Sequence, residues 1–434
     1  MNTEPERMKT SHLYGRQTEL TLENMSFSNI KLSSFPDFID AYAKIKKAAA
    51  LSNWKAGELD ENKMNRICAA CDLVIRGDYR DEFPVDVFHG GGGIGLNMNA
   101  NEVIARLAGD EVDAINDVNM SQSTSEVNHT ALRIALIKML GELDRSLEVF
   151  NQILHHKVEE FKGVRTIART CFQDGVSVLL SVFFSSLETV LSRNRIKLDA
   201  AREDMHEVNL GWTVIGTGEG ASDAFRSYIL QSLQAVSGYQ LRWADDLYAA
   251  AQYPDDIASL SSLIRITASI LHKFANDLRI LSSGPETGFG ELILPNVQAG
   301  SSFFPGKVNP VIPEMVIQCS MLITGNNAIV QDALDMGETY LNLWEEMMGF
   351  LVMDNINMLK NVIDHFGALC VAGIKADLER CTTYSQSSIP TLSGAKKKYS
   401  YQTLSQWIHQ DGLPKVVAKL KKENEEQHDE KPAT

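Results

Sequence analysis

The chain has 434 residues, of which 44% are hydrophobic and 22% are charged. This composition is typical of a soluble globular protein that is long enough for more than one domain. The formal net charge of -15 argues against nucleic acid and anionic membrane surfaces as partners, because polyanions are recognised by clustered positive charge. A small dianionic substrate, held by a few local cations, is compatible with the same net charge.

The N-terminal segment MNTEPERMKTSHLYGRQ lacks the basic-then-apolar layout of a secretory signal. No apolar stretch reaches the roughly 20 residues that a membrane-spanning helix needs. The six cysteines are scattered through the chain and do not form a disulfide framework, which fits a reducing compartment. Cys68 and Cys71 have the spacing of a redox pair, but a buried structural pair on a helix is favoured. We therefore expect a cytoplasmic protein.

The first part of the chain, residues 1–122, mixes short helical segments with turn signals. Its most distinctive feature is the polyglycine run at 90–93, which follows His89. Glycine runs of this kind are typical of loops. We expect a compact N-terminal domain over residues 1–122, with this loop at its surface.

A pattern of long helices begins near Thr130, where apolar residues recur at steps of three and four. The apolar positions are Leu132, Ala135, Leu136, Met139, Leu140, Leu143, Leu147, Phe150, Leu154 and Val158. Similar stretches follow at 176–208, 221–236, 257–283 and 313–367. Helices much longer than the average are found in bundles or across subunits. We therefore expect a central long-helix bundle domain over residues 123–375.

The remaining residues, 376–434, predict a small C-terminal domain whose composition turns polar after Cys381. The tail KLKKENEEQHDEKPAT is expected to be too charged to pack. The predicted fold class is therefore mostly α, with three domains.

The sequence contains no P-loop, no GxGxxG after a strand, no zinc-ligand pair and no GxSxG elbow. Its histidines are spread singly, apart from His155 and His156 on the predicted long helix. We therefore expect neither a metal ion nor an organic cofactor.

The segment at 300–311, GSSFFPGKVNPV, is the most informative part of the chain. Its glycines and prolines prevent regular structure, so the segment is suited to a mobile loop over a substrate. It offers hydroxyls, one cation and one amide: Lys307 and Asn309 can hold a carboxylate and the extra charge that it gains, while a serine handles the proton. Judged from these residue types alone, an ordinary surface loop is about equally compatible.

This segment, continued to Glu314, matches the signature GSSxMPxKxNPxxxE of the aspartase/fumarase superfamily, with Phe304 in place of Met. Other segments resemble the family too: VDVFHGGGGIGLNMNANEV its substrate loop, NMSQSTSEVNHTALRIA its second block and IARTCFQDGVSV its third. The similarity runs from about Tyr14 to Cys381. The sequence as a whole favours the aspartase branch of the family.

The resemblance implies a homotetramer built on a central bundle of long helices, because in this family three subunits contribute one block each to a site. It also implies an anti elimination of a small dicarboxylate-type substrate. A base removes the proton beside one carboxylate, an aci-carboxylate (enediolate) intermediate forms, and the group on the neighbouring carbon leaves.

Residue by residue, the resemblance assigns Ser301 as the base. Lys307 and Asn309 match the groups that bind the carboxylate that becomes the enediolate, and Thr170 supports them. By the same correspondence, the groups that hold the other carboxylate are Ser123, Thr124 and, from the loop, Ser302.

The chain departs from the family pattern in the first and second blocks. Ile94 stands where a substrate-contacting hydroxyl is expected, so an apolar side chain replaces a hydrogen-bond donor. In the second block, Ser125 and Glu126 replace the family's Asn-Asp pair. The replaced Asn belongs to the groups around the departing amino group in aspartases.

A further departure lies in the third block, where Cys171 replaces the imidazole that is usually paired with the carboxylate matched by Glu314. In the second block, His129 stands in place of a proline. A capped or solvent-facing role is favoured for His129, and a role in place of the missing imidazole is the alternative. Cys171 is explained as a small hydrophobe that fills the same space.

Three functions remain after these comparisons with the family pattern. The leading one is a lyase that breaks a C–N bond in aspartate or in a substituted aspartate or succinate, giving fumarate or a related unsaturated acid. The second is a fumarate hydratase-like C–O lyase. The third is a tetrameric paralogue that binds without catalysis. Retention of Ser301, Lys307 and Asn309 together argues against the third.

Overall fold

The structure is a computed structural model that describes residues 12–429. The chain divides into two compact units. Unit 1 contains Met1–Arg145, Asn194–Ala268 and Cys319–Lys360, and unit 2 contains Ser146–Arg193, Ser269–Gln318 and Asn361–Thr434. The expected division into three domains stays a prediction.

Helices supply nearly all the regular structure, which confirms the mostly α expectation. The α-helices are α1 (Arg16–Met25), α2 (Pro36–Lys55), α3 (Glu61–Ile75), α4 (Ile94–Ala108), α5 (Thr124–Glu160), α6 (Ser181–Asp204), α7 (Asp223–Ser237), α8 (Leu247–Gln252), α9 (Asp255–Leu281), α10 (Val311–Asp335), α11 (Glu345–Leu369), α12 (Leu378–Ser385), α13 (Ser388–Ala395), α14 (Tyr401–Asp411) and α15 (Leu413–Asp429). The strands are β1 (Arg165–Thr170), β2 (Gln173–Leu179), β3 (Glu207–Val208), β4 (Arg242–Trp243), β5 (Leu292–Ile293) and β6 (Lys375–Ala376).

The long-helix expectation is confirmed for α5, which has 37 residues, but two predicted stretches are wrong in detail. The stretch at 176–208 begins as strand β2, and its helix α6 starts only at Ser181. The stretch at 313–367 is two helices, α10 and α11. Asn342 lies between them: its Nδ2 donates to the Ala333 carbonyl at 3.2 Å, and its Oδ1 accepts from the Trp344 N–H at 2.9 Å. One side chain thus satisfies backbone groups of two helix ends.

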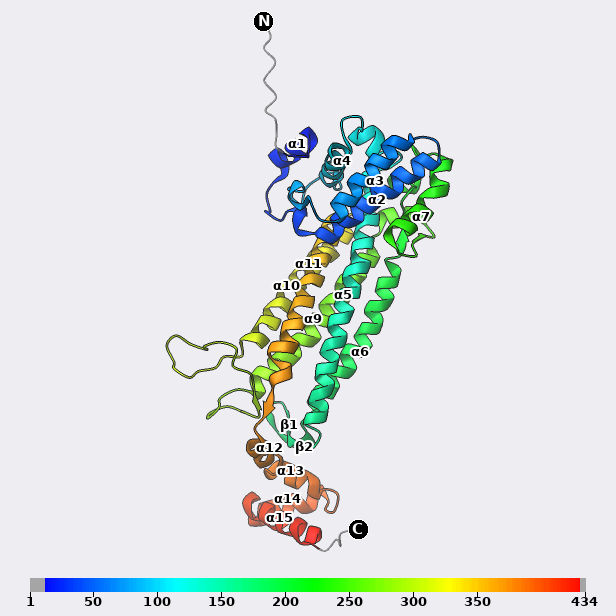
Figure 1. Cartoon of the computed structure of the whole chain (residues 1–434). Helices are drawn as coiled ribbons and strands as arrows, with labels where there is room; N and C mark the ends of the chain where they lie inside the picture. Colours follow the sequence, from blue (N-terminus) through cyan, green and yellow to red (C-terminus); the bar gives the residue numbers. More distant parts are fainter. Residues whose placement is uncertain (1–11, 430–434) are drawn as a thin grey trace. The chain divides into compact units, whose positions relative to one another are not determined.

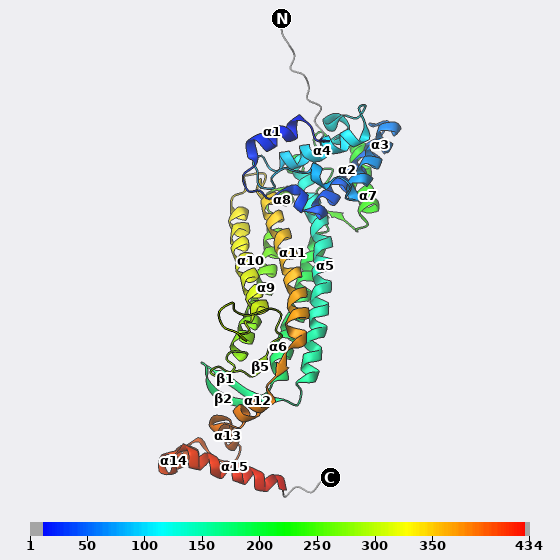
Figure 2. The same ribbon diagram turned by 60° about the vertical axis from the view of Figure 1, so that its left-hand side comes forward.

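Unit 1 has its core where the N-terminal helices meet parts of α5 and α11. The rings of Phe35 and Phe38 both lie 4.9 Å from that of Phe350, centroid to centroid. Gly349 on α11 approaches Leu132 on α5 so closely that a Cβ at 349 would lie 2.3 Å from a Leu132 methyl. Figures 1 and 2 show α5, α9 and α11 running side by side. The helical period predicts this core, because Leu132 is one of the listed apolar positions.

Unit 2 contains an aromatic cluster and the β1–β2 hairpin. Phe366 stacks on Phe150 at 5.6 Å between centroids and meets Phe274 edge-on at 5.9 Å. Phe184 also meets Phe274 at 5.9 Å. Aromatic rings at these separations add to the free energy gained from burial. The cluster therefore fixes the helix segments against which the hairpin lies.

The C-terminal end of unit 2 corrects one prediction. The charged tail was expected not to pack, yet α15 runs to Asp429 and buries Leu420, which is 2% exposed. Leu420 forms a small core with Leu404 and Val416. The apolar positions Val416, Val417 and Leu420 recur at helical spacing, and this signal outweighs the charge between them. Residues 430–434 lie outside the described residues.

Between residues 12 and 429, every helix is either too short or too polar to cross a lipid bilayer.

We predict that Gly349→Ala lowers the free energy of unfolding by about 1–3 kcal/mol, because the new methyl group overlaps Leu132. Gly394→Ala is the matched control, since a Cβ there meets no atom within 4 Å. There, the higher helix propensity of Ala should leave stability unchanged or raise it by up to about 1 kcal/mol. Urea denaturation measures both variants. Equal stability of the two would contradict the close packing of α5 on α11.

Candidate active site

The glycine-rich loop in unit 1 is a tight turn that precedes α4. Gly91, Gly92 and Gly93 all have positive φ, and a Cβ at Gly93 would lie 2.1 Å from the Asn128 amide nitrogen. Only glycine fits there, since both the backbone conformation and the space exclude a side chain. Ile94 follows as the first residue of α4 and is 42% exposed. The side chain of Ile94 is therefore accessible to solvent at the edge of this loop.

The second block begins α5 and is supported by a series of hydrogen-bonded polar side chains. Thr124 Oγ1 accepts from Asn97 Nδ2 at 3.0 Å, and Asn97 Oδ1 accepts from Lys46 Nζ at 2.9 Å. Lys46 also donates to Asn119 Oδ1 at 2.9 Å. Burial lowers the pKa of Lys46 to about 7. The hydroxyl of Thr124 is therefore positioned by groups that never reach the surface.

Glu126, the next residue but one, is fully buried and ties two segments together. Its carboxylate accepts from the backbone N–H of Ser123 at 2.9 Å and from those of Gly211 and Thr213, each at 2.7 Å. Burial raises the pKa of Glu126 to about 7, although these N–H groups favour the charged form. Thr213 has φ of 53° and ψ of -147°, a strained backbone that such contacts hold in place.

His129 is neither capped nor solvent-facing, so that expectation is wrong. It is 2% exposed, and its Nδ1 lies 2.9 Å from Glu345 Oε1. Arg133 donates to the same Glu345 oxygen at 2.6 Å and to Asp256 at 2.7 Å. Burial raises the pKa of Glu345, but the charges of His129 and Arg133 outweigh burial and lower it to about 2. His129 is therefore one member of a buried ionic cluster beside Ser125.

The third block, in unit 2, forms the β1–β2 hairpin. Thr170 ends β1, and the two-residue turn is Cys171-Phe172, with φ of 54° and 57°. Such turns normally carry Asn or Gly, so two bulky residues with positive φ are strained. Both side chains are exposed, Phe172 to 68%. The turn therefore presents a thiol and a ring at the place where the family has an imidazole.

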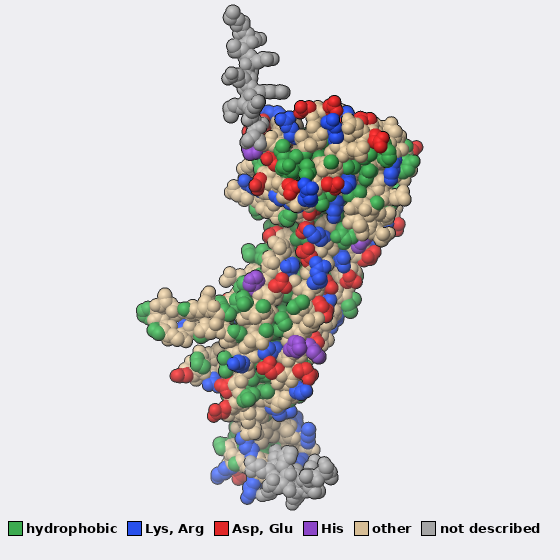
Figure 3. All heavy atoms as spheres, in the orientation of Figure 1, with side chains coloured by type: hydrophobic (Ala, Val, Ile, Leu, Met, Phe, Trp, Pro, Cys, Tyr) green, Lys and Arg blue, Asp and Glu red, His purple; other side chains and the backbone are tan. Residues whose placement is uncertain are grey.

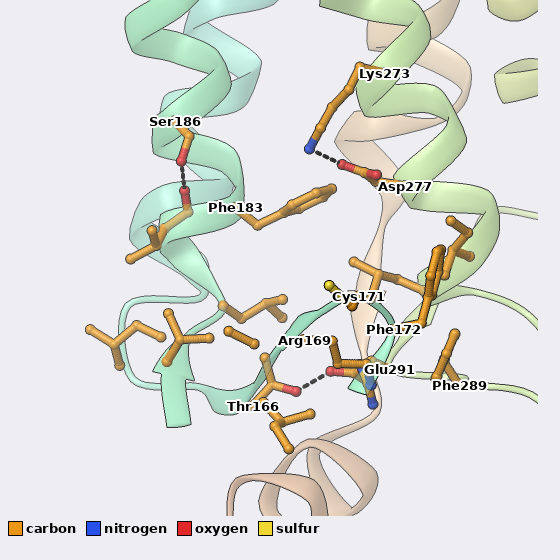
Figure 4. Close-up of a pocket in the computed structure, with 18 residues that line it drawn as sticks. Thr166, Arg169, Cys171, Phe172, Phe183, Ser186, Lys273, Asp277, Phe289 and Glu291 are labelled. Carbon is orange, nitrogen blue, oxygen red and sulfur yellow. Dashed lines mark hydrogen bonds and ion pairs between the residues drawn. The ribbon is translucent and has the colours of Figure 1, made fainter. Parts of the chain in front are cut away.

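Behind this hairpin lies a cavity of about 470 Å³ between β1, β2, α6 and α9. Figure 4 shows Cys171 directed into it, opposite Phe183. At its base Glu291 accepts from Thr166 and from Arg169, the latter at 2.5 Å. The Arg169 guanidinium also lies 4.3 Å from the centre of the Phe289 ring. The charged groups at this base are thus paired, and most of the lining is apolar.

The signature loop at 300–310 is closed at its base by backbone contacts. Gly300 N–H donates to the Lys307 carbonyl at 3.0 Å, and Asn309 Nδ2 donates to the Gly300 carbonyl. Ser301 Oγ accepts from the N–H groups of Phe303 at 3.0 Å and Phe304 at 2.9 Å. The base of the loop is therefore a small, hydrogen-bonded module.

The outer part of this loop is open to solvent. Residues 302–308 are all exposed, and the segment extends away from the helices in Figure 1. Figure 3 shows hydrophobic side chains at its outer end, and Phe303 is 80% exposed. Lys307 Nζ lies 5.5 Å from the centre of the Phe304 ring. The loop therefore presents two aromatic rings and one cation to solvent.

Glu314 lies in the first turn of α10, half-buried, with its carboxylate 3.6 Å from Arg279 Nε. Since Cys171 carries no imidazole, Arg279 is the cation that this carboxylate meets within unit 2. Among the described residues, no group of three or more His, Cys, Asp or Glu side chains is arranged to hold a metal ion.

Eight of the sequence-predicted residues fall into two sets, while Thr170 and Cys171 lie in the hairpin and Glu314 in α10. In unit 1 the structure brings together a first set, made of Ser123, Thr124, Ser125 and His129, close to the loop of Ile94. In unit 2, a second set shares the signature loop: Ser301, Ser302, Lys307 and Asn309. Sequence reasoning missed Lys46, although it follows Tyr42 by four residues on a face of α2 that is otherwise apolar, and this spacing marks a buried position.

Known proteins resemble this chain over most of its length. A family model described as "Lyase" matches residues 6–325. An aspartate ammonia-lyase of Pseudomonas aeruginosa is 38% identical over 400 residues, covering 90% of this chain and 84% of the relative. A fumarate lyase:delta crystallin from Brucella melitensis, solved with cobalt, has a TM-score of 0.90 and 36% identity, covering 94% of this chain and 92% of that one. A class II fumarase from Schistosoma mansoni has a TM-score of 0.89 and 25% identity, covering 97% and 93%.

We predict that Glu345→Gln lowers the free energy of unfolding by about 3 kcal/mol at pH 7, since Arg133 loses a buried counter-charge. The pKa of Glu345 is lowered from 4.5 to about 2 on folding, so its stabilisation is present above pH 4.5 and is lost as the pH falls towards 2. Urea denaturation should therefore show a constant deficit from pH 7 to 5 that shrinks below pH 4.5.

The exposed Glu338→Gln serves as the control for this experiment and should change stability by less than about 0.5 kcal/mol. A deficit for Glu345→Gln that is as large at pH 3 as at pH 7 would show that charge is not its cause.

Proposed function

The chain belongs to the aspartase/fumarase superfamily of lyases, and on this premise we propose that it catalyses an anti elimination that breaks a C–N bond in aspartate or a substituted aspartate. The product is fumarate or a related unsaturated acid. The observation that carries the proposal is the signature loop, in which Ser301, Lys307 and Asn309 lie within one hydrogen-bonded module. Curated relatives named aspartate ammonia-lyase, at 36–38% identity over 90% of the chain, support a C–N lyase.

In the proposed mechanism, Ser301 removes the proton beside one carboxylate of the substrate. The electron pair of that C–H bond moves onto the carboxylate, which becomes the aci-carboxylate (enediolate), and Lys307 and Asn309 stabilise the added charge. The pair then returns to form the C=C bond while the C–N bond breaks, and the amine leaves with the bonding electrons. Thr170, from the hairpin, supports Lys307 and Asn309. Ser123 and Thr124 hold the other carboxylate, with Ser302 assisting from the loop.

A serine is a weak base near neutral pH, so its hydroxyl must be activated. Ser301 Oγ accepts two backbone N–H groups, from Phe303 and Phe304. Donors to an oxygen favour its negatively charged form. Closure of the loop adds a second effect, because exclusion of water strengthens the attraction between the alkoxide and the Lys307 ammonium.

We further propose a homotetramer of three-domain subunits, in which three subunits contribute one conserved block each to a site. Exposed apolar side chains on α10 support this assembly: Met321 is 61%, Leu322 58% and Ile329 44% exposed. Contiguous apolar surface on a long helix is typical of a protein interface. A cytoplasmic location is part of the same proposal and is supported by six cysteines that are all free.

We propose that the side chains around the departing nitrogen of the substrate differ from those in typical aspartases. The groups expected there are replaced by Ser125 and by Cys171, and the exposed Ile94 stands where the substrate loop has a hydroxyl. A small hydroxyl, a thiol and an apolar side chain favour a nitrogen that carries a larger or less polar substituent, such as an N-alkyl or N-acyl group.

We predict that Lys307→Ala lowers kcat/KM by at least about a hundredfold, because the enediolate loses its cationic partner. Stability should be unchanged, since Lys307 is exposed. The assay follows the absorbance of the new conjugated double bond. Lys162→Ala, another exposed lysine, is the control and should keep full activity. Sedimentation velocity checks that both variants assemble as the wild type does, and full activity of Lys307→Ala would overturn the proposed role.

We also predict that plain L-aspartate is a poor substrate, with kcat/KM about a hundredfold or more below that of a preferred N-substituted aspartate. Each missing partner leaves roughly 1–3 kcal/mol of ammonium desolvation uncompensated, and two such losses give a factor of this size. The same absorbance assay, run with aspartate, malate and N- and 3-substituted aspartates, makes the comparison. Turnover of malate alone would identify a hydratase, and absence of any turnover would favour a non-catalytic paralogue.

A further inference from the structure

The cavity behind the β1–β2 hairpin is large enough to hold a ring. Its volume is about 470 Å³, and all of its lining residues belong to unit 2. An apolar cavity of about 150 Å³ already binds benzene, so this one has room for a ring together with a short chain. The elimination proposed above uses none of the interior of this cavity, which leaves the space and its lining without a role.

Aliphatic and aromatic side chains make up most of the cavity wall. Figure 4 shows Phe183 reaching from α6 toward α9, where its ring stacks on Phe274 at 4.8 Å between centroids. Ile167 and Val178 line the cavity from the hairpin, and Ile280 lines it from α9. A wall of this kind favours an apolar occupant, because the gain in free energy grows with the apolar area that leaves water.

Every charged side chain in the described lining of the cavity has a partner of opposite sign. Arg169 Nη1 lies 2.5 Å from Glu291 Oε1, and Lys273 pairs with Asp277 at the exposed rim. A charged occupant would have to separate one of these pairs or enter without a counter-charge, which is costly in apolar surroundings. The cavity therefore selects an uncharged group and disfavours anionic and cationic groups alike.

Cys171 marks the side of the cavity that belongs to the candidate active site. It follows Thr170 directly, and its thiol is directed into the cavity (Figure 4). A thiol is smaller than an imidazole and hydrogen-bonds weakly, so the mouth is wider and less polar than the family's imidazole would leave it. Cys171 and Phe172 both have positive φ. Backbone strain of this kind is found most often at functional sites.

We propose that this cavity binds an uncharged aromatic group carried by the nitrogen of the substrate, so that the preferred substrate is an N-aryl or N-arylmethyl aspartate. The inference rests on the proposed function, because Cys171 replaces a group that lies around the departing nitrogen in aspartases. In N-phenylaspartate, Ser301 removes the proton from carbon and the C–N bond breaks. The nitrogen keeps the bonding electron pair and takes up one proton, which gives fumarate and aniline. Phe172 and Phe183 supply rings against which the aromatic group packs.

The binding test uses benzylsuccinate, in which a CH2 group replaces the nitrogen of N-phenylaspartate. This compound keeps the aromatic group and both carboxylates but has no nitrogen to lose, so it measures binding without turnover. Isothermal titration calorimetry on the whole protein compares it with succinate. Benzylsuccinate is expected to bind at least about tenfold more tightly, because its phenyl group leaves water. Equal affinities would overturn the proposal.

A matched pair of variants on α6 places the effect in the cavity. Ser186 is exposed and lines the cavity, so Ser186→Phe should fold and should fill the space with a ring. The preference for benzylsuccinate is then expected to fall to about twofold or less. Ser185→Phe, one residue earlier and outside the lining, is the control and should keep the full preference. A full preference in Ser186→Phe would remove the aromatic group from this cavity.

Two further measurements guard against a variant that fails to fold. Cys171→His narrows the mouth, and because His tolerates positive φ it should fold while lowering the preference for benzylsuccinate. Crystals of the wild type under xenon pressure should show anomalous density in the cavity, since xenon enters apolar cavities. Absence of xenon there would contradict the apolar character on which the proposal depends.

Turnover separates this inference from the proposed function. N-phenylaspartate should have a kcat/KM at least about tenfold above that of N-methylaspartate, and Ser186→Phe should remove the difference. Tight binding of benzylsuccinate without turnover of either N-substituted aspartate upholds the cavity and contradicts the proposed function. Turnover of both at equal kcat/KM upholds the proposed function and overturns the role of the cavity.

Discussion

The buried carboxylate of Glu126 is the constraint on which the unit 1 half of the site depends. It accepts backbone N–H groups from Ser123, at the start of the second block, and from Gly211 and Thr213, more than eighty residues later. Removal of such an anchor would leave three donors without an acceptor, two of them buried. The strained backbone at Thr213 and the backbone of Ser123, just ahead of α5, are therefore held by one side chain that touches no substrate in the proposed mechanism.

Much of the helical framework could be predicted from the sequence, because apolar side chains recur along α5 and α9 with the period of a helix. The β1–β2 hairpin could not, since its turn is Cys171-Phe172 rather than the Asn-Gly type that marks a hairpin. The break between α10 and α11 was missed for a related reason. It depends on Asn342, whose side chain bonds backbone groups on both sides, and a single polar residue between two apolar stretches gives little warning.

The candidate site, too, could be predicted from the sequence only in part. The loop residues Ser301, Lys307 and Asn309 could be predicted because a long motif fixes their order. The sequence favours a capped or solvent-facing His129, because its buried partner Glu345 lies 216 residues away and no local pattern indicates the pair. Lys46 was not predicted as part of the site for a similar reason. An ionisable side chain is buried only where the fold supplies partners for it. Those partners can be distant in the sequence, so a local sequence pattern does not indicate them.

The closed base of the signature loop has a consequence for the entropy of catalysis. Gly300 bonds the Lys307 carbonyl, Asn309 bonds the Gly300 carbonyl, and Ser301 bonds two amides of the same loop. The dihedral angles between the base and the carboxylate-binding groups are therefore largely set before any substrate arrives. Closure then needs a swing at the loop's ends rather than the ordering of ten residues, each of which would cost about 1–2 kcal/mol of backbone entropy. The affinity lost to closing the loop is correspondingly small.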